Sequence, residues 1–318
     1  MNAENLNEYS TGLGIDLESL ELIQENKYCL IHLAKTRDKR CIIKKYRGQD
    51  PAMMMMEAKA LSFYHELTRG DPELMDSGNP IVNPEKNLLC IGFVEGRPLS
   101  DTLYSARRNR NLQDKAHRYM RILGRLMRTI FEKTEQPEKN TEPLIFEYFD
   151  FTSKRLEENS LLGPIFFKGY QKSGAELVAK FVKAKISPSF VHGDFVFRNI
   201  HVSENRVGLI DFANSLYLSH PLNDIYNMRI ALDNMLIPKY FKNDLLNNFS
   251  DGFQPIEFPE IAHQFYYEYQ RRRWLMLKLC WSNVEEQRMS LNDLKDWIQG
   301  LRGLATFAKP YNSTVKFP

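Results

Sequence analysis

The chain of 318 residues contains only four cysteines, which stand far apart at Cys29, Cys41, Cys90 and Cys280. None of them belongs to a Cys-x-x-Cys pair, so the sequence shows no zinc-binding spacing and no disulfide framework. Three of the four lie in apolar runs, where a buried free thiol is the expected state. Unpaired thiols are typical of a reducing compartment, and we therefore predict a cytoplasmic protein.

Long apolar runs and strong net charge are also lacking. No stretch approaches the ~20 apolar residues that a membrane-spanning helix needs. The N-terminal residues MNAENLNEYSTGLGID are polar and acidic, which does not fit a signal peptide. The net charge is only +3, whereas a nucleic-acid-binding protein shows a concentrated basic face. With 43% hydrophobic and 26% charged residues, the composition is typical of a globular protein without a transmembrane segment or a nucleic-acid partner.

The first ninety or so residues read mostly as strands with one helix. Residues 20–46 hold three apolar runs, broken at residues 25–27 and 36–39, which predicts an antiparallel meander. Asp50 and Pro51 then form the N-cap and first position of a helix that ends before Gly70. We expect two further short strands near residues 73–76 and 88–94.

The remainder of the chain is mainly helical. Residues 112–133 carry apolar side chains at three- and four-residue spacing, and similar patterns follow at 150–160, 165–185 and 221–308. One strand-loop-strand block, FVHGDFVFRNIHVSENRVGLIDF, stands alone among these helices. We therefore predict an α+β fold with a small antiparallel-sheet lobe over residues 1–92 and a larger helical lobe over residues 93–318. The hinge would fall at residues 92–96.

The isolated block carries a spaced set of polar side chains. Asp194 follows His192 and Gly193, Asn199 lies five residues after the aspartate, and Asp211 lies twelve residues after the asparagine. Phosphoryl transfer needs a carboxylate that orients and deprotonates the attacking hydroxyl, together with oxygen ligands for magnesium. A loop with Asp and Asn, followed by a hairpin that ends in a second Asp, supplies all three groups.

The motif HGDFVFRN followed by IDF resembles the aminoglycoside phosphotransferase and choline kinase superfamily, which is related to protein kinases. The resemblance implies a protein-kinase-like bilobal fold that binds ATP and Mg²⁺. It further implies Asp194 as the catalytic base and Asn199 and Asp211 as magnesium ligands. Asp224, in the sequence HPLNDIY, would support the catalytic loop, and His192 would hold that loop through a backbone hydrogen bond.

The N-terminal lobe also resembles this family, through motifs that are less specific than the HGDFVFRN block. Lys44 resembles the strand lysine that reaches the α- and β-phosphates, with Glu57 on the following helix as its partner. Successive strand residues point to opposite faces, so only one of Lys44 and Lys45 can face the nucleotide, and we favour Lys44. The sequence LLCIGFVEGRPLS resembles the hinge of the family, which implies adenine contacts with the backbone from Gly92 to Val94.

The sequence departs from the family and from protein kinases at several places. Residues 25–28 hold no glycine, so the first turn is not a glycine-rich phosphate loop. Phe131 stands where the family commonly carries a histidine. Asp211 and Asp224 are separated by no long activation segment, and Phe195 and Val196 replace the leucine and lysine typical of serine/threonine kinases.

These observations favour a Mg-ATP-dependent kinase for a hydroxyl group of a small molecule or glycan, such as a sugar, a sugar derivative or an amino alcohol. Two alternatives stay open, a protein kinase and a non-catalytic nucleotide-binding scaffold. The missing activation segment argues against the first. The retention of Lys44, Asp194, Asn199 and Asp211 argues against the second.

A last pattern concerns the acceptor. Residues 259–281 read as a helix in which Arg272 falls within an apolar stripe, flanked by Arg271 and Arg273. A charged side chain on such a stripe must either pair internally with an acid or line a polar cleft. If Arg272 lines the acceptor cleft, it suits carboxylate or phosphate groups, and we expect a neutral or anionic acceptor rather than a polycation. The stripe consists of Ile261, Phe265, Tyr269, Met276 and Leu279.

Overall fold

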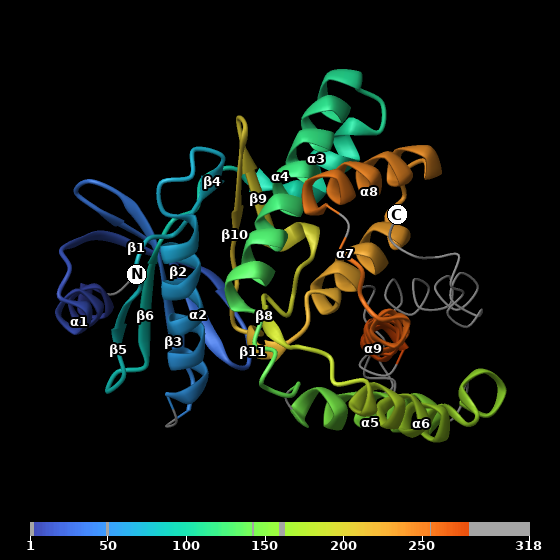
Figure 1. Cartoon of the computed structure of the whole chain (residues 1–318). Helices are drawn as coiled ribbons and strands as arrows, with labels where there is room; N and C mark the ends of the chain where they lie inside the picture. Colours follow the sequence, from blue (N-terminus) through green and yellow to red (C-terminus); the bar gives the residue numbers. More distant parts are fainter. Residues whose placement is uncertain (1–2, 49–50, 142, 159–162, 255, 280–318) are drawn as a thin grey trace. The chain divides into compact units, whose positions relative to one another are not determined.

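The computed structural model describes residues 3–48, 51–141, 143–158, 163–254 and 256–279. Its contacts divide the chain into two compact units (Figure 1). The first unit comprises residues 1–103 and 197–215, and the second comprises residues 104–196 and 216–318. No helix in the described ranges has the length and apolar character needed to cross a bilayer.

A five-stranded antiparallel sheet forms the first part of the first unit. The predicted breaks at residues 25–27 and 36–39 separate its first three strands, so the meander is confirmed. The side chain of Asn26 fixes the first turn because its oxygen accepts hydrogen bonds from the amides of Tyr28 and Cys29. In spatial order the strands are β1 (Leu17–Glu25), β2 (Cys29–Thr36), β3 (Arg40–Tyr46), β6 (Leu88–Gly92) and β5 (Ile81–Asn83).

Two helices accompany this sheet. The helix α1 (Ala3–Leu13), which the sequence did not predict, contacts β1, β5 and β6 and places Tyr9 and Leu13 in the core. The predicted helix after Pro51 is present as α2 (Ala52–Thr68). Asp50, its predicted N-cap, lies outside the described residues, and Pro51 occupies the N-cap position.

A second, four-stranded sheet completes the first unit, with the strand order β4 (Leu74–Met75), β10 (Arg206–Leu209), β9 (Ile200–Ser203) and β7 (Arg97–Pro98). The hairpin β9–β10 thus pairs with strands from the start of the chain, which differs from the predicted boundary at residue 92. Gly96 permits this pairing because a side chain there would lie 2.3 Å from the carbonyl oxygen of Val202. The functional division into lobes of residues 1–92 and 93–318 stays a prediction.

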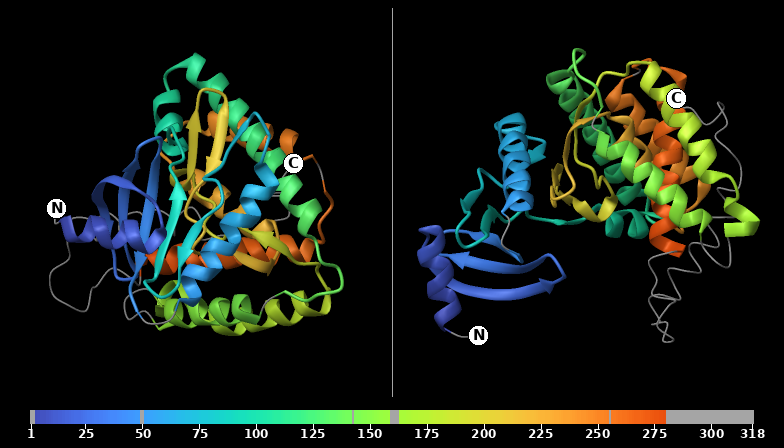
Figure 2. Two further views of the ribbon diagram at one scale, coloured as in Figure 1. Left: turned by 90° about the vertical axis from the view of Figure 1, so that its left-hand side faces the viewer. Right: turned by 90° about the horizontal axis from the view of Figure 1, so that it is seen from below.

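The second unit is helical around a short ladder of β8 (Ser189–Val191) and β11 (Leu216–Ser219). Two glycines allow α4 and α8 to approach closely, because a side chain at Gly124 or at Gly252 would collide with the other helix's backbone. In Figure 2, α5, α6 and α9 lie side by side, and all three pairs are in contact. The helices are α3 (Leu99–Ala106, which spans the boundary), α4 (Arg110–Thr134), α5 (Pro143–Glu157), α6 (Tyr170–Lys183), α7 (Leu222–Asn234), α8 (Lys239–Phe253) and α9 (Glu260–Leu279), with a π-helical turn at Gly163–Phe167.

Candidate active site

Lys44 on β3 lies at the centre of a buried ionic cluster in the first unit. Its ammonium nitrogen is 2.7 Å from Glu57 Oε1 on α2 and 3.2 Å from Asp211 Oδ1. Burial alone would lower the pKa of Lys44, but the two carboxylates outweigh it and raise the pKa above its usual range. Lys44 is therefore a fixed cation that joins the sheet, the helix and the segment after β10.

Glu57 is fully buried and is held by two partners, Lys44 and the hydroxyl of Tyr46. The predicted pairing of Lys44 with Glu57 is thus present. A buried carboxylate is stable only when it is paired and hydrogen-bonded, which both neighbours provide. Lys45 points to the opposite face of β3 and forms an ion pair of 2.9 Å with Glu8 on α1. The strand register expected for the two lysines is the one observed.

Asn199 and Asp211 flank the open end of the β9–β10 hairpin. Ile200 pairs with Leu209, and the amide of Ile210 donates a 3.0 Å hydrogen bond to the carbonyl oxygen of Asn199. Asp211 has a φ of +63°, a left-handed conformation that is uncommon for residues other than glycine. Such strain at a polar residue is frequent in functional sites.

The donor set at this hairpin end fits a hard divalent cation. Asn199 offers an amide oxygen and Asp211 a half-exposed carboxylate, and magnesium prefers such oxygen ligands. Within the described ranges, no three His, Cys, Asp or Glu side chains are grouped as a complete metal site. A cation held by Asn199 and Asp211 would therefore take its remaining ligands from phosphate oxygens and water.

The predicted hinge uses part of its hydrogen-bonding capacity within the protein. The amide of Gly92 donates to the carbonyl oxygen of Ser77 over 2.8 Å, and the amide of Phe93 donates to that of Arg40. A side chain at Gly92 would lie 2.5 Å from the same oxygen of Ser77, so this position requires glycine. The amide of Gly92 is therefore already engaged within the protein. The carbonyl oxygen of Val94 lies 3.3 Å from His201 Nδ1.

The loop that carries Asp194 belongs to the second unit, and Asp224 on α7 supports it. The two carboxylate oxygens of Asp224 accept hydrogen bonds from the amides of His192 (2.7 Å) and Gly193 (2.9 Å). Burial raises the pKa of Asp224, while His192 and the two amides act in the opposite direction. The amide of Asp194 donates to His192 Nδ1 over 3.3 Å, so both supporting contacts expected from the sequence are present.

Arg273 on α9 is a further contact of this loop, one that the sequence did not single out. It donates a 2.9 Å hydrogen bond to the carbonyl oxygen of Gly193, and its guanidinium lies 3.7 Å from Asp194 Oδ1. The available signal was its position beside the apolar stripe of the helix. Arg273 thus places a positive charge next to the Asp194 carboxylate.

Arg272, the residue expected either in an internal ion pair or in the acceptor cleft, has the internal position. It is 3% exposed, and its Nε lies 3.5 Å from Glu268 Oε2. Its guanidinium also donates to Ser153 on α5 and to the carbonyl of Tyr170 and the hydroxyl of Ser173 on α6. The apolar stripe itself is confirmed for Phe265, Tyr269, Met276 and Leu279, which are all buried.

The predicted site residues thus fall into two groups. Lys44 contacts both Glu57 and Asp211 in the first unit, which also contains Asn199 and the hinge. Asp194 belongs to the second unit with Asp224 and Arg273. Four residues of chain separate Asp194 from Asn199.

One family model matches most of the chain. Residues 31–275 match the family model described as the phosphotransferase enzyme family, APH. This range contains every predicted site residue, from Lys44 to Asp211. No curated protein matches the sequence in the corresponding comparison.

Solved structures show the same fold at low sequence identity. A spectinomycin phosphotransferase in complex with ADP and spectinomycin is 15% identical, covers 96% of this chain and 98% of its own, and superposes with a TM-score of 0.58. An amicoumacin kinase bound to AMP-PNP and Ca²⁺ is 12% identical, with 98% and 96% covered and a TM-score of 0.62. An APH(4)-Ia aminoglycoside phosphotransferase with ADP and hygromycin B is 11% identical, with 96% and 99% covered and a TM-score of 0.59.

The expected α+β, kinase-like fold is confirmed by these neighbours. The use of ATP with a divalent metal ion agrees with the family. The chain therefore belongs to the phosphotransferase enzyme family and is an ATP-dependent kinase that acts on a hydroxyl group of a small molecule.

Proposed function

We propose that this enzyme transfers the γ-phosphoryl group of Mg-ATP to a hydroxyl of a sugar, a sugar derivative or an amino alcohol, either free or carried on a glycan. The observation that carries the proposal is the contact of Lys44 with both Glu57 and Asp211. It links the residue assigned to the nucleotide phosphates with the residue assigned to the metal. Kinases require both groups to be in place for transfer.

Each residue has a separate role in this proposal. Residues 1–92 cover the nucleotide: Lys44 binds the α- and β-phosphates, Glu57 orients Lys44, and the backbone from Gly92 to Val94 binds adenine. Asn199 and Asp211 would hold Mg²⁺, which supplies neutralisation of phosphate charge when bound. Residues 93–318 carry the acceptor site.

Asp194 is the proposed catalytic base. Its carboxylate accepts the proton of the acceptor hydroxyl as that oxygen attacks the γ-phosphorus, while the bond to the bridging oxygen breaks and ADP leaves. The fixed backbone of the loop supports this role, because Asp224 holds the two preceding amides and Arg273 holds the carbonyl of Gly193. Four intervening residues tie Asp194 to Asn199, which limits their separation to ~18 Å in any arrangement of the two units.

The preference for a neutral or anionic acceptor now rests on Arg273 instead of Arg272. The guanidinium of Arg273 lies 3.7 Å from Asp194 Oδ1 and adds a positive charge next to the proposed base. A polycationic acceptor would be repelled by it, whereas a sugar or an acidic glycan would not. Efficient phosphorylation of kanamycin-like polyamines, compared with neutral and acidic sugars, would contradict this preference.

A cytoplasmic location is part of the same proposal. Cys29, Cys41 and Cys90 are free and buried. Unpaired thiols are typical of reducing compartments.

Replacement of Asp194 by asparagine tests the assignment of the base. The change keeps the size of the side chain and removes the proton acceptor, so turnover should fall by about 10²–10⁴-fold. Binding of Mg-ATP, measured by calorimetry, should stay within a few-fold of wild type. Near-normal turnover on the acceptor identified in a panel of sugars, amines and glycan fragments would exclude Asp194 as the base.

A further inference from the structure

A cavity of about 370 Å³ lies on the face of α9 that packs against α6. Its wall includes an aromatic ring and several charged side chains, of which Arg271, Arg272 and Glu268 are at least nine-tenths buried. On α6 the lining includes Tyr170, Glu176 and Lys180, and on α9 it includes Glu268, Arg271 and Arg272.

The buried charges of this cavity do not balance. Arg271 Nη1 lies 3.0 Å from Glu268 Oε1, and Arg272 Nε lies 3.5 Å from Glu268 Oε2, so two guanidinium groups share one carboxylate. The hydrogen-bond partners of Arg272 are neutral, namely two hydroxyls and a carbonyl oxygen. The part-exposed Glu157 also interacts with Arg272 electrostatically, but it is not part of the buried cluster. A buried charge is costly unless a counter-charge accompanies it. Among these three buried side chains, one positive charge is therefore left over.

Hydrogen-bonding capacity is left over as well. The Nε atom of Arg271 is buried and has no hydrogen-bond acceptor. The buried Nε atom of Arg272 faces Glu268 Oε2 at 3.5 Å, a distance longer than that of an ordinary hydrogen bond. Burial lowers the pKa of Arg272, whereas Glu268 outweighs burial at Arg271 and raises its pKa. Glu268 thus compensates Arg271 better than Arg272. An anion in the cavity would supply both the missing charge and the missing acceptors.

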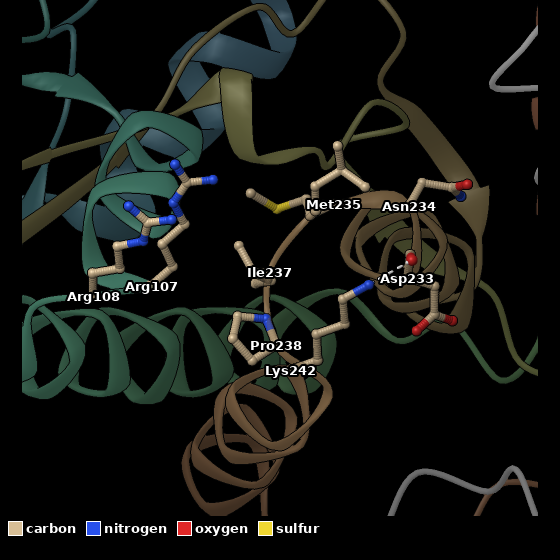
Figure 3. Close-up of a pocket in the computed structure, with 9 residues that line it drawn as sticks. Arg107, Arg108, Asp233, Asn234, Met235, Ile237, Pro238 and Lys242 are labelled. Atoms are coloured by element: carbon tan, nitrogen blue, oxygen red, sulfur yellow. Dashed lines mark hydrogen bonds between the residues drawn. The ribbon is translucent and has the colours of Figure 1, made fainter.

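The cavity in Figure 3 offers a contrast. It is lined by Arg107, Arg108 and Lys242 beside Met235 and Ile237. Both arginines are exposed, and Lys242 donates to the backbone carbonyl of Asp233 over 2.6 Å. Because water already solvates these two arginines, they give no comparable reason for an anion to bind.

The α6–α9 cavity is also separate from the contacts of the catalytic loop. On α9 that loop is held by Arg273, which points to Gly193. Arg271 and Arg272 contact Tyr170 instead, with their guanidinium carbons 5.8 and 4.4 Å from its ring centre. Consecutive helix residues differ by about 100° in direction, so one helix can serve both places.

We propose that the cavity between α6 and α9 is a second ligand site, which binds an oxyanion, a carboxylate or a phosphate, carried on a molecule of monosaccharide size. Guanidinium groups bind such oxyanions through paired hydrogen bonds. The exposed ring of Phe166, which also lines the cavity, provides apolar surface for the body of the ligand. The site lies outside the proposed catalytic machinery, so its ligand is either an effector or a distal part of a larger acceptor.

Thermal unfolding and calorimetry of the full chain, without nucleotide and at constant ionic strength, test the site. The probes are inorganic phosphate, glucose 6-phosphate and glucuronate, with glucose as the neutral control. At least one anion should raise the Tm in a saturable way, since a ligand bound to the native state stabilises it. Glucose should not. The relative effects of phosphate, sugar phosphate and sugar acid identify the source of the oxyanion.

Two substitutions at the buried charges give opposite expectations. Arg271→Met removes the surplus cation and leaves Arg272 with Glu268, so the anion-dependent shift should disappear while the Tm without anion stays equal to wild type or rises. Glu268→Gln removes the shared carboxylate, so the Tm without anion should fall and the anion-dependent shift should grow. Lys180→Met changes an exposed residue at the cavity and should weaken anion binding several-fold without affecting the fold.

Lys44→Met is the control for anion binding at the nucleotide site, because it removes the cation proposed to bind the nucleotide phosphates. The anion-dependent rise in Tm should be unchanged in this variant. The proposal is overturned if no anion shifts the Tm in excess of glucose. It is equally overturned if Arg271→Met and Lys180→Met retain the wild-type shift, or if Lys44→Met alone abolishes it.

Discussion

Arg273 donates a 2.9 Å hydrogen bond to the carbonyl oxygen of Gly193, so a helix far along the chain holds the residue directly before Asp194. Its neighbour Arg272 has a different function in the fold. It contacts Glu268, Ser153 and the start of α6 within the packed helices. Adjacent arginines thus divide between the catalytic loop and the interior.

This division predicts different consequences for two methionine substitutions. Arg273→Met should lower kcat, because a displacement of a catalytic group by about 1 Å can cost up to 10²-fold, while the KM for ATP stays near wild type. Arg272→Met should instead lower the free energy of unfolding by about 2 kcal/mol or more through its lost hydrogen bonds. Steady-state kinetics and urea unfolding of both variants distinguish them. Reversed effects would mean that Arg272 is the residue at the acceptor.

A second prediction concerns the lysine pair on β3. Lys44→Met should raise the KM for ATP by at least about tenfold, since it removes a buried cation at the phosphates. Lys45→Met is the matched control, because it removes only a part-exposed ion pair with Glu8, which is worth about 0–1 kcal/mol. Kinetics at varied ATP on samples of verified Tm give the comparison. Equal KM values for the two variants would contradict the role of Lys44.

Much of the first unit could be predicted from local sequence. The breaks of the meander coincide with polar turns, and Asn26 shows why, since its side chain accepts two amide hydrogen bonds. The resemblance of HPLNDIY to the family motif also pointed to the support of the catalytic loop by Asp224, and the hydrogen bonds from the amides of His192 and Gly193 are present.

Other features depend on contacts between distant segments. The helix α1 is polar except for a few residues such as Tyr9 and Leu13, and only the sheet gives it a buried face. The hairpin β9–β10 joins the first unit because β10 pairs with β4 and β9 with β7, more than a hundred residues earlier. The contact of Arg273 with Gly193 spans 80 residues. No local pattern encodes such pairings.

The metal requirement provides a third prediction. Asp211→Asn removes the carboxylate that would bind Mg²⁺ and also one of the two anionic partners of Lys44. The Mg²⁺ concentration for half-maximal activity at saturating ATP should rise about tenfold or more, since magnesium prefers anionic oxygen. Magnesium titrations of wild type and variant measure it. An unchanged midpoint would count against Asp211 as a ligand.

The last prediction starts from a buried histidine next to α7. His220 stacks on Tyr266 with ring centres 5.5 Å apart and meets the ring of Phe258 edge-on at 4.5 Å. Its Nδ1 accepts a 3.2 Å hydrogen bond from the amide of Leu222, which requires an unprotonated nitrogen. Burial, and to a smaller extent His263, lowers the pKa of His220 from 6.5 to about 3.

A depressed pKa in the folded state means that His220 stabilises the fold above pH 6.5, where it is neutral in both states, and that this contribution is lost as the pH falls toward 3. Between pH 7 and pH 5 the loss should be about 2 kcal/mol, because each pH unit below the unfolded pKa corresponds to about 1.4 kcal/mol. His220→Asn keeps an acceptor for the amide of Leu222 and does not titrate. Urea unfolding at several pH values gives the free energy of unfolding of both proteins. The advantage of wild type over the variant should be about 2 kcal/mol smaller at pH 5 than at pH 7. Parallel curves for the two proteins would show that His220 is not held neutral by the fold.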